Sequence, residues 1–230
     1  MMSASKLSAI LAITVLAACS GGTENIGGQL AIFSELRETG KKNRIVREAP
    51  QLVPEITRVF LDTVTAPSLE VTVEKSGQTG FLVPAAYRED STRGRVTVWK
   101  TVEDENVVVR SGVLIATKAL GRDLVSADVS TVISSIASRK SGGGLRTLHV
   151  RNDVNGTEEL RIQCEISVVG PETITIIERS YHTLHMNEKC AVGSGEVSND
   201  YWIDSVGTMR QSKQWAGPFV GYLSMRLLKK

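Results

Sequence analysis

The chain has 230 residues, and its 27 Lys and Arg nearly balance its 25 Asp and Glu, so the formal net charge is only +2. Near-neutral charge together with 41 % apolar residues excludes a typical disordered tail. The sequence contains no long run of Lys and Arg, which argues against a nucleic-acid partner. Three Cys are too few for a small disulfide-scaffold protein, so we expect one domain with a sizeable core.

The N-terminal segment 1–18 has the features of a signal peptide. Lys6 precedes an uncharged run over 7–18, which is shorter than the roughly 20 residues that span a membrane. Residues 16–19 (LAAC) match a bacterial lipobox, in which cleavage precedes the Cys and the thiol carries diacylglycerol. The sequence therefore predicts lipidation of Cys19. The alternative is an ordinary secretory signal with an incidental Cys.

Acylation would attach the mature protein to a membrane, because each buried CH₂ of an acyl chain such as palmitate contributes about 0.8 kcal/mol. Ser20 is not the Asp associated with inner-membrane retention, so we expect the outer membrane, with the protein facing the periplasm. Residues 19–28 are rich in Gly and Ser and predict a lipidated flexible tether. The remaining residues, 29–230, form the predicted single β-rich periplasmic domain.

The first part of this domain mixes helical and strand patterns. Apolar spacing predicts short helices over 29–39 and 54–63. From Ser68 the apolar residues alternate with polar ones, which is typical of a strand, and the segments 95–102 and 106–115 predict a hairpin around an acidic turn.

A third helix is predicted over 128–139, with Asp128 as its N-cap, and strands follow to the end of the chain. The predicted strands cover 145–151, 159–169, 172–186, 201–204, 209–215 and 220–228. Strands that follow strands without helices between them indicate an antiparallel domain. The predicted fold class is mainly β, an antiparallel meander forming a curved sheet, half-barrel or sandwich, with two or three short helices.

The two remaining cysteines, Cys164 and Cys190, are predicted to form a disulfide. The periplasm is oxidising, and the two residues lie in or beside neighbouring strands of the meander. The alternative, a redox-active pair, lacks the Cys-x-x-Cys spacing that such sites use.

The sequence offers few groups for catalysis. His182 and His185 are three positions apart in a predicted strand and therefore face opposite sides, which disfavours a shared metal site. Ser194 lies between two glycines, but the flanking residues do not match the nucleophile-elbow pattern. We expect no catalytic residue, no metal site and no cofactor.

The densest cluster of polar and aromatic residues is the C-terminal hairpin. Its candidate ligand-binding residues are Tyr201, Trp202, Asp204, Arg210, Gln211 and Ser212. Aromatic faces stack on sugar rings, and planar polar groups hydrogen-bond hydroxyls. The alternative is structural: Trp202 covers the core, and Asp204 fixes the turn through an Asx hydrogen bond.

The stretch 199–215 resembles the YjbF/GfcB family of outer-membrane lipoproteins, also called group 4 capsule polysaccharide lipoproteins. The shared pattern is Tyr-Trp-Ile-Asp followed by Gly and then Arg-Gln-Ser-x-Gln. A second match covers 110–124, where Ala119 replaces the usual Gly. The resemblance implies a mostly β fold and a non-catalytic role in capsule or exopolysaccharide assembly or export, with polysaccharide or export proteins as partners.

A different function is also compatible with the sequence. A half-barrel lipoprotein can carry a lipid or another hydrophobic ligand on its concave face. An open apolar cavity would favour such a carrier. A polar groove at Trp202, Asp204 and Arg210 would favour glycan binding.

Overall fold

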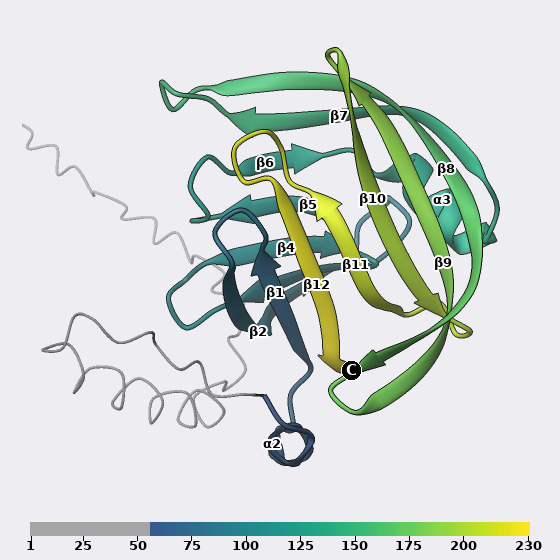
Figure 1. Cartoon of the computed structure of the whole chain (residues 1–230). Helices are drawn as coiled ribbons and strands as arrows, with labels where there is room; N and C mark the ends of the chain where they lie inside the picture. The colour runs from purple at the N-terminus through teal and green to yellow at the C-terminus, as the bar shows by residue number, and fades with distance from the viewer. Residues whose placement is uncertain (1–55) are drawn as a thin grey trace, which may run out of the picture. The chain divides into compact units, whose positions relative to one another are not determined.

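The computed structural model describes residues 56–230. The predicted signal peptide, Cys19, the tether and the helix over 29–39 lie outside the described residues. Within 56–230, twelve strands form one antiparallel sheet in the order β5-β4-β3-β2-β1-β12-β11-β10-β9-β8-β7-β6. The sheet curves until its edge strands, β5 and β6, lie side by side, which produces a nearly closed barrel (Figure 1). The predicted antiparallel curved sheet is confirmed.

The elements have the following bounds. The strands are β1 (Ser68–Val73), β2 (Gln78–Arg88), β3 (Val96–Lys100), β4 (Asn106–Arg110), β5 (Val113–Lys118), β6 (Leu124–Ala127), β7 (Gly142–Arg151), β8 (Thr157–Ile176), β9 (Arg179–Val192), β10 (Gly195–Asp204), β11 (Met209–Trp215) and β12 (Tyr222–Lys229). The described helices are α2 (Arg58–Thr63) and α3 (Ser130–Ser138). Neither of these two helices is long and apolar enough to cross a lipid bilayer.

The predicted hairpin around the acidic turn is confirmed as β3 and β4, but the predicted strand 106–115 is wrong. The chain reverses at Ser111 and Gly112, which have φ angles of 49° and 87°, and β5 begins directly afterwards. Gly112 is required there because a Cβ would lie 2.4 Å from Cβ of Met209.

The turn predicted at Gly170 and Pro171 is also wrong. Strand β8 continues through these residues, with a bulge between Val168 and Gly170 that absorbs the irregular backbone. The chain turns instead at Ile177 and Glu178, whose φ angles of 43° and 64° fit a two-residue hairpin turn. The predicted strand 172–186 is therefore divided between β8 and β9.

Both described helices begin later than predicted. Thr57 is the N-cap of α2, and its hydroxyl accepts a hydrogen bond from the Phe60 N–H at 3.2 Å. The N-cap of α3 is Val129 rather than Asp128. The Asp128 carboxylate instead accepts the Ser130 N–H at 2.9 Å. This hydrogen bond closes a turn just before the helix.

Helix α3 covers part of one end of the barrel. Its apolar face, which includes Val132, Ile133 and Ile136, packs against Met186 and Tyr201 inside the sheet. Arg139, at the C-terminus of the helix, connects it to the β10–β11 turn. Its Nη2 donates to the carbonyls of residues 204 and 205 at 2.7 and 2.8 Å. The helix is thereby fixed at the end of the barrel where β10 ends and β11 begins.

The two edge strands are joined by side chains at the other end of the barrel. No backbone ladder connects β5 to β6 in the described part of the chain. The Thr117 hydroxyl donates to Asp123 Oδ1 at 2.8 Å and accepts the Leu124 N–H at 3.0 Å. Asp123 Oδ2 also accepts the Ala119 N–H at 2.9 Å. These contacts replace the missing ladder bonds there.

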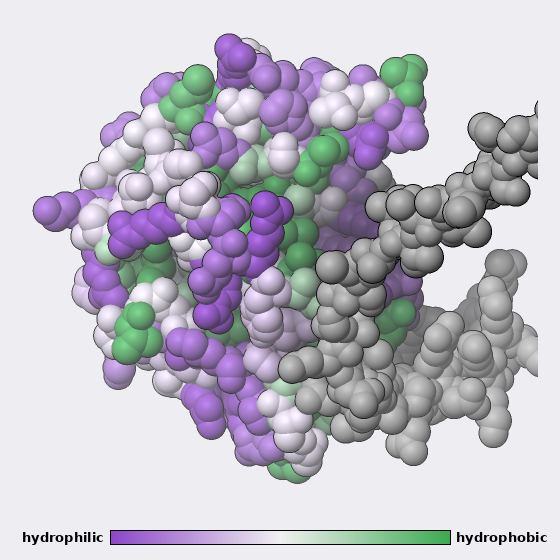
Figure 2. Space-filling view, turned by 180° about the vertical axis from the view of Figure 1, so that it is seen from behind, coloured by the Kyte–Doolittle hydropathy of each residue, from purple (hydrophilic) through white to green (hydrophobic). Residues whose placement is uncertain are grey.

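The outer face of the sheet carries a separate small core. Leu61 of α2 packs against Ile176 of β8 and Leu228 of β12. Arg58 donates to the carbonyls of Ile176 and Ile177 at 2.8 and 2.9 Å, so the helix holds the tip of the β8–β9 hairpin. Elsewhere, on the face shown in Figure 2, apolar side chains (green) are scattered among polar ones (purple).

The predicted disulfide is present. Cys164 and Cys190 face each other directly on β8 and β9, with a Cα–Cα distance of 4.0 Å, and both are buried. The bond closes a loop with a sequence separation of 26 residues. Loops of this length give a stabilisation of roughly 3–4 kcal/mol by the loss of unfolded-state entropy.

Replacing both cysteines with Ala is expected to lower the free energy of unfolding by about 3 kcal/mol. Guanidinium denaturation of the purified protein measures this difference. Reduced wild-type protein is the control and is expected to unfold close to the double variant. Coincident transitions for oxidised and reduced wild type would show that the bond does not stabilise the fold.

Candidate ligand-binding cavity

Asp204 holds the turn between β10 and β11. Its Oδ1 accepts the N–H groups of Val206 and Thr208 at 3.1 and 2.8 Å, and its Oδ2 accepts from Arg210 Nε at 2.7 Å. Burial by itself raises the pKa of Asp204, but these hydrogen bonds and the Arg210 charge outweigh it, so the pKa lies below its usual value. Asp204 therefore makes the hydrogen bonds within the turn that its structural alternative expected.

Tyr201 and Ser212 point into the barrel rather than to its outer surface. The Tyr201 ring is fully buried, and its hydroxyl donates to Glu188 Oε2 at 2.7 Å. Burial, together with the negative charge of Glu188, raises the pKa of Tyr201 well above its usual value, so the phenol stays protonated. The Ser212 hydroxyl accepts from Gln214 Nε2 at 2.9 Å.

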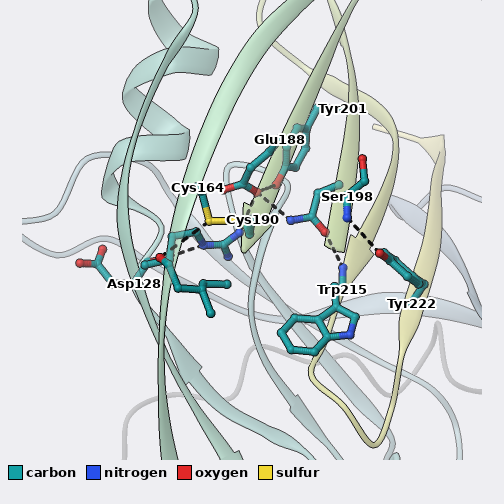
Figure 3. Close-up of a disulfide and its surroundings, with 11 residues drawn as sticks. Asp128, Cys164, Glu188, Cys190, Ser198, Tyr201, Trp215 and Tyr222 are labelled. Carbon is teal, nitrogen blue, oxygen red and sulfur yellow. Dashed lines mark hydrogen bonds and ion pairs between the residues drawn. A yellow bond between two sulfur atoms is a disulfide. The ribbon is translucent and has the colours of Figure 1, made fainter. Parts of the chain in front are cut away.

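Glu188 is the centre of a buried polar network beside the disulfide (Figure 3). Its Oε2 also accepts from Arg146 Nη1 at 2.8 Å and from Asn199 Nδ2 at 2.7 Å. Asn199 Oδ1 in turn accepts the Trp215 N–H at 2.7 Å, so the network connects β7, β9, β10 and β11. Oε1 of Glu188 is one of three buried side-chain atoms that lack a hydrogen-bond partner among the described residues, with Ser68 Oγ and Asn106 Oδ1.

The sequence analysis missed this network. The one available signal was Glu188 itself, since it occupies an inward position of β9 between the apolar residues Met186 and Cys190. The carboxylate and the two cysteine sulfurs lie within 4.8 Å of one another. The sulfurs are bonded to each other, so this group does not offer a set of metal ligands in the oxidised protein.

Gln214 crosses the barrel interior. Its Oε1 accepts the Leu114 N–H at 2.8 Å, and its Nε2 donates to the Gly112 carbonyl at 2.8 Å. One amide thus supplies the acceptor and the donor that a neighbouring strand would give to β5. This contact joins the two segments, 110–124 and 199–215, that the sequence analysis singled out.

Trp202 lies on the outer face of β10. Its indole stacks on the His185 ring with the centroids 4.5 Å apart, and its Nε1 donates to Glu172 Oε2 at 2.8 Å. His185 Nε2 contacts Asp200 Oδ1 at 2.8 Å. The six predicted ligand-binding residues therefore do not form one continuous surface.

A cavity of about 610 Å³ opens at the same end of the barrel as α3. It lies between strands β1–β4 on one side and β11–β12 on the other. Its inner wall is mostly apolar and includes Leu69, Trp99, Val109, Met225 and Leu227. Its rim is polar and includes Tyr87, Arg95, Thr97 and Lys230. Arg210, Gln211 and Ser212 also line it, so the structure brings three of the six predicted residues to this cavity.

One side of the cavity is bounded by residues 89–95 between β2 and β3, which we call the rim loop. The guanidinium of Arg110 holds Asp90 of this loop in a paired contact, with Nη1–Oδ1 and Nη2–Oδ2 distances of 2.9 and 2.8 Å. Arg110 Nη1 also donates to the carbonyl of Gly94 at 2.9 Å. Such two-point contacts fix orientation as well as distance, so Arg110 sets the shape of the rim loop.

Replacing Gln214 with Leu is expected to lower the free energy of unfolding by about 3 kcal/mol, because it leaves the buried N–H of Leu114 and the Gly112 carbonyl unpaired. Guanidinium denaturation checks this value. Gln163→Leu, on an exposed position of β8, is the matched control and should change stability by less than about 0.5 kcal/mol. Equal effects of the two substitutions would contradict a special role for Gln214.

The pKa of Asp90 is lowered to about 2, chiefly by the hydrogen bond from Arg110. Because this value lies below that of the unfolded chain, the contact contributes fully above about pH 4 and is lost as the pH falls toward 2. A carboxyl NMR titration should give a midpoint near pH 2. In Arg110→Gln the midpoint should return toward the ordinary range, and a wild-type midpoint near 4 would contradict the contact.

The comparisons with known proteins give one family match and one similar fold. Residues 40–228 match the family described as group 4 capsule polysaccharide lipoprotein GfcB, YjbF. A comparison with curated proteins found no match.

Two solved structures are similar to this chain. The hypothetical lipoprotein YmcC from Escherichia coli (K12) aligns with a TM-score of 0.66 at 18 % identity, covering 80 % of this chain and 98 % of that chain. At this identity the likeness shows the fold alone. A Bacteroides fragilis protein with a YmcC-like fold is 10 % identical over 71 % of this chain and 93 % of its own, and its TM-score of 0.31 supports no argument. Since the family match spans most of the sequence, the chain belongs to the group 4 capsule polysaccharide lipoprotein family, GfcB/YjbF.

Proposed function

We propose that this protein is a non-catalytic lipoprotein of the outer membrane that assists capsule or exopolysaccharide assembly or export by binding glycan. Acyl chains on Cys19 would anchor it, and the domain would face the periplasm. Membership of a capsule polysaccharide lipoprotein family supports the pathway, and the lipobox at 16–19 supports the anchor.

The observation that carries the proposal is the cavity at the barrel end, where aromatic and planar polar groups meet. Tyr87 is 55 % exposed at the rim, and the Arg95 guanidinium lies 5.7 Å from the centre of its ring. Aromatic rings offer apolar faces to sugar C–H groups, while guanidinium groups and hydroxyls such as that of Thr97 hydrogen-bond sugar hydroxyls. The volume of about 610 Å³ falls within the range of small-ligand sites.

A second candidate is a carrier for a lipid or another hydrophobic ligand. The observation that favours it is the apolar inner wall of the same cavity, formed by residues such as Leu69, Val109 and Leu227. The two candidates differ in where the ligand gains its free energy. A glycan would depend on the polar rim, whereas an apolar ligand would depend on the inner wall.

The test is a calorimetric titration with exopolysaccharide purified from the organism that carries this protein. Tyr87→Ala and Thr97→Ala are each expected to weaken binding about fivefold, because each loses a contact of about 1 kcal/mol. Trp202→Ala, on the outer face, tests the hairpin surface and should leave the affinity unchanged.

Two results would contradict glycan binding in the cavity. One is unchanged affinity in both rim variants with a loss in Trp202→Ala, which would place the site on the outer face. The other is no exopolysaccharide binding together with saturable binding of a long-chain fatty acid, which would favour the carrier.

A further inference from the structure

The charged residues that line the cavity already contact other groups of the fold. Arg95 Nε lies 3.2 Å from Glu89 Oε1, and Arg210 Nε lies 2.7 Å from Asp204 Oδ2. Lys230 Nζ donates to the Thr208 hydroxyl at 2.8 Å. The inner wall, in contrast, consists of uncharged side chains: Leu69, Trp99, Val109, Met225 and Leu227. An uncharged and mostly apolar group therefore fits against this wall best, because a charged one would lose water without gaining an ion pair there.

Trp99 has an unused hydrogen-bond donor on this wall. The residue is 7 % exposed and lines the cavity from β3. Its Nε1–H has no acceptor among the described residues, and Nε1 is not one of the three buried atoms that lack a partner. Buried indole N–H groups usually find an acceptor. Since Trp99 meets open space at the cavity, a group bound there can supply that acceptor.

Ser212 has a second unused donor, on the β11 side of the cavity. The residue is 2 % exposed and lines the cavity. Its Oγ accepts from Gln214 Nε2, and its own proton has no acceptor in the part of the chain that the structure describes. The cavity thus combines an apolar wall with hydrogen-bond donors, which suits a neutral acceptor carried by a small apolar group.

An acetyl group on a sugar has this combination of properties. Its methyl group is apolar, and its carbonyl oxygen only accepts hydrogen bonds. An unmodified sugar carries hydroxyls on most of its carbons, and hydroxyls placed against the inner wall would lose water without enough partners. An acetyl group is also small compared with the cavity of about 610 Å³, so the sugar that bears it has room beside the polar rim.

We propose that the cavity binds an acetylated glycan. The acetyl methyl would lie against the inner wall, and the acetyl carbonyl would accept from Trp99 Nε1 or from the Ser212 hydroxyl. The sugar ring would lie at the rim beside Tyr87. The inference rests on the proposed function and names its ligand class. Acetyl esters and acetyl amides present the same methyl and carbonyl groups, and the experiment distinguishes between them.

The experiment measures binding of exopolysaccharide fragments, from the organism that carries this protein, before and after removal of acetyl groups. Dilute alkali removes acetyl esters and leaves acetyl amides, whereas hydrazine removes both. We expect one treatment to weaken binding about tenfold, because the ligand loses a hydrogen bond and a buried methyl group. Fragment length is checked after each treatment, so that the loss reflects the acetyl groups alone.

The protein variant is Trp99→Phe, which keeps an aromatic ring on the inner wall and removes the N–H. It should bind acetylated fragments about fivefold more weakly and deacetylated fragments as well as wild type does. The matched control is Trp215→Phe, the same change at a partly buried tryptophan that packs on the core and does not line the cavity. It should change the affinity less than about twofold.

A fluorescence measurement keeps the test independent of how well Trp99→Phe folds. In Trp202→Phe/Trp215→Phe, Trp99 is the one tryptophan left of the three in the chain. Acetylated fragments should change its emission, and deacetylated fragments at the same concentration should change it much less. Equal changes with both kinds of fragment would contradict contact between the acetyl group and Trp99.

The outcomes separate this inference from the proposed function. Equal affinity for native and deacetylated fragments, with a loss in Tyr87→Ala, would overturn the acetyl specificity and leave glycan binding intact. Binding of an exopolysaccharide that contains no acetyl groups would do the same. Equal losses in Trp99→Phe and Trp215→Phe would overturn the role of Trp99 as the donor. Failure of wild type to bind any fragment would contradict both the inference and the proposed function.

Discussion

The contact of Gln214 with β5 across the interior determines how this barrel can be filled. Eight strands enclose about the space that side chains can fill, whereas barrels of sixteen strands contain a water-filled channel. Twelve strands lie between these cases, so side chains alone leave space. Gln214 Oε1 and Nε2 bind Leu114 and Gly112 directly, which shows that β11 and β5 approach each other through the interior. The interior is thereby divided, and α3 fills one part of the barrel end while the other part remains as the cavity.

The filled part is stabilised by polar as well as apolar contacts. Arg146 and Glu188 are both nearly inaccessible, and removing either partner of such a pair is costly because a buried charge is left without compensation. Asn199 and Tyr201 also donate hydrogen bonds to Oε2 of Glu188. The disulfide joins β8 to β9 beside this carboxylate. These contacts make one wall rigid. The rim on the other side is a loop, and Arg110 holds it through Asp90 and the carbonyl of Gly94.

The sequence predicted the fold class because period-two alternation is a local property of each strand. It did not reveal the turn at Ile177 and Glu178, since neither residue is one that two-residue turns usually select. Alternation along the strand also predicted that Tyr201 and Ile203 share one face and that Trp202 lies on the other. Alternation alone cannot say which of these faces is inside the barrel. The cavity was only partly predictable: Arg210, Gln211 and Ser212 are adjacent in sequence, whereas the rim loop reaches them through long-range strand pairing.

Hydrogen–deuterium exchange of the full chain, with and without exopolysaccharide from the organism that carries it, tests glycan binding in the cavity most directly. The account predicts slower exchange in the rim loop and at 207–212, where the two sides of the cavity meet. It predicts unchanged exchange in the turn at Gly193 and Ser194, at the opposite end of the barrel. Protection confined to the outer strands around His185 and Trp202, with the rim loop unaffected, would contradict it.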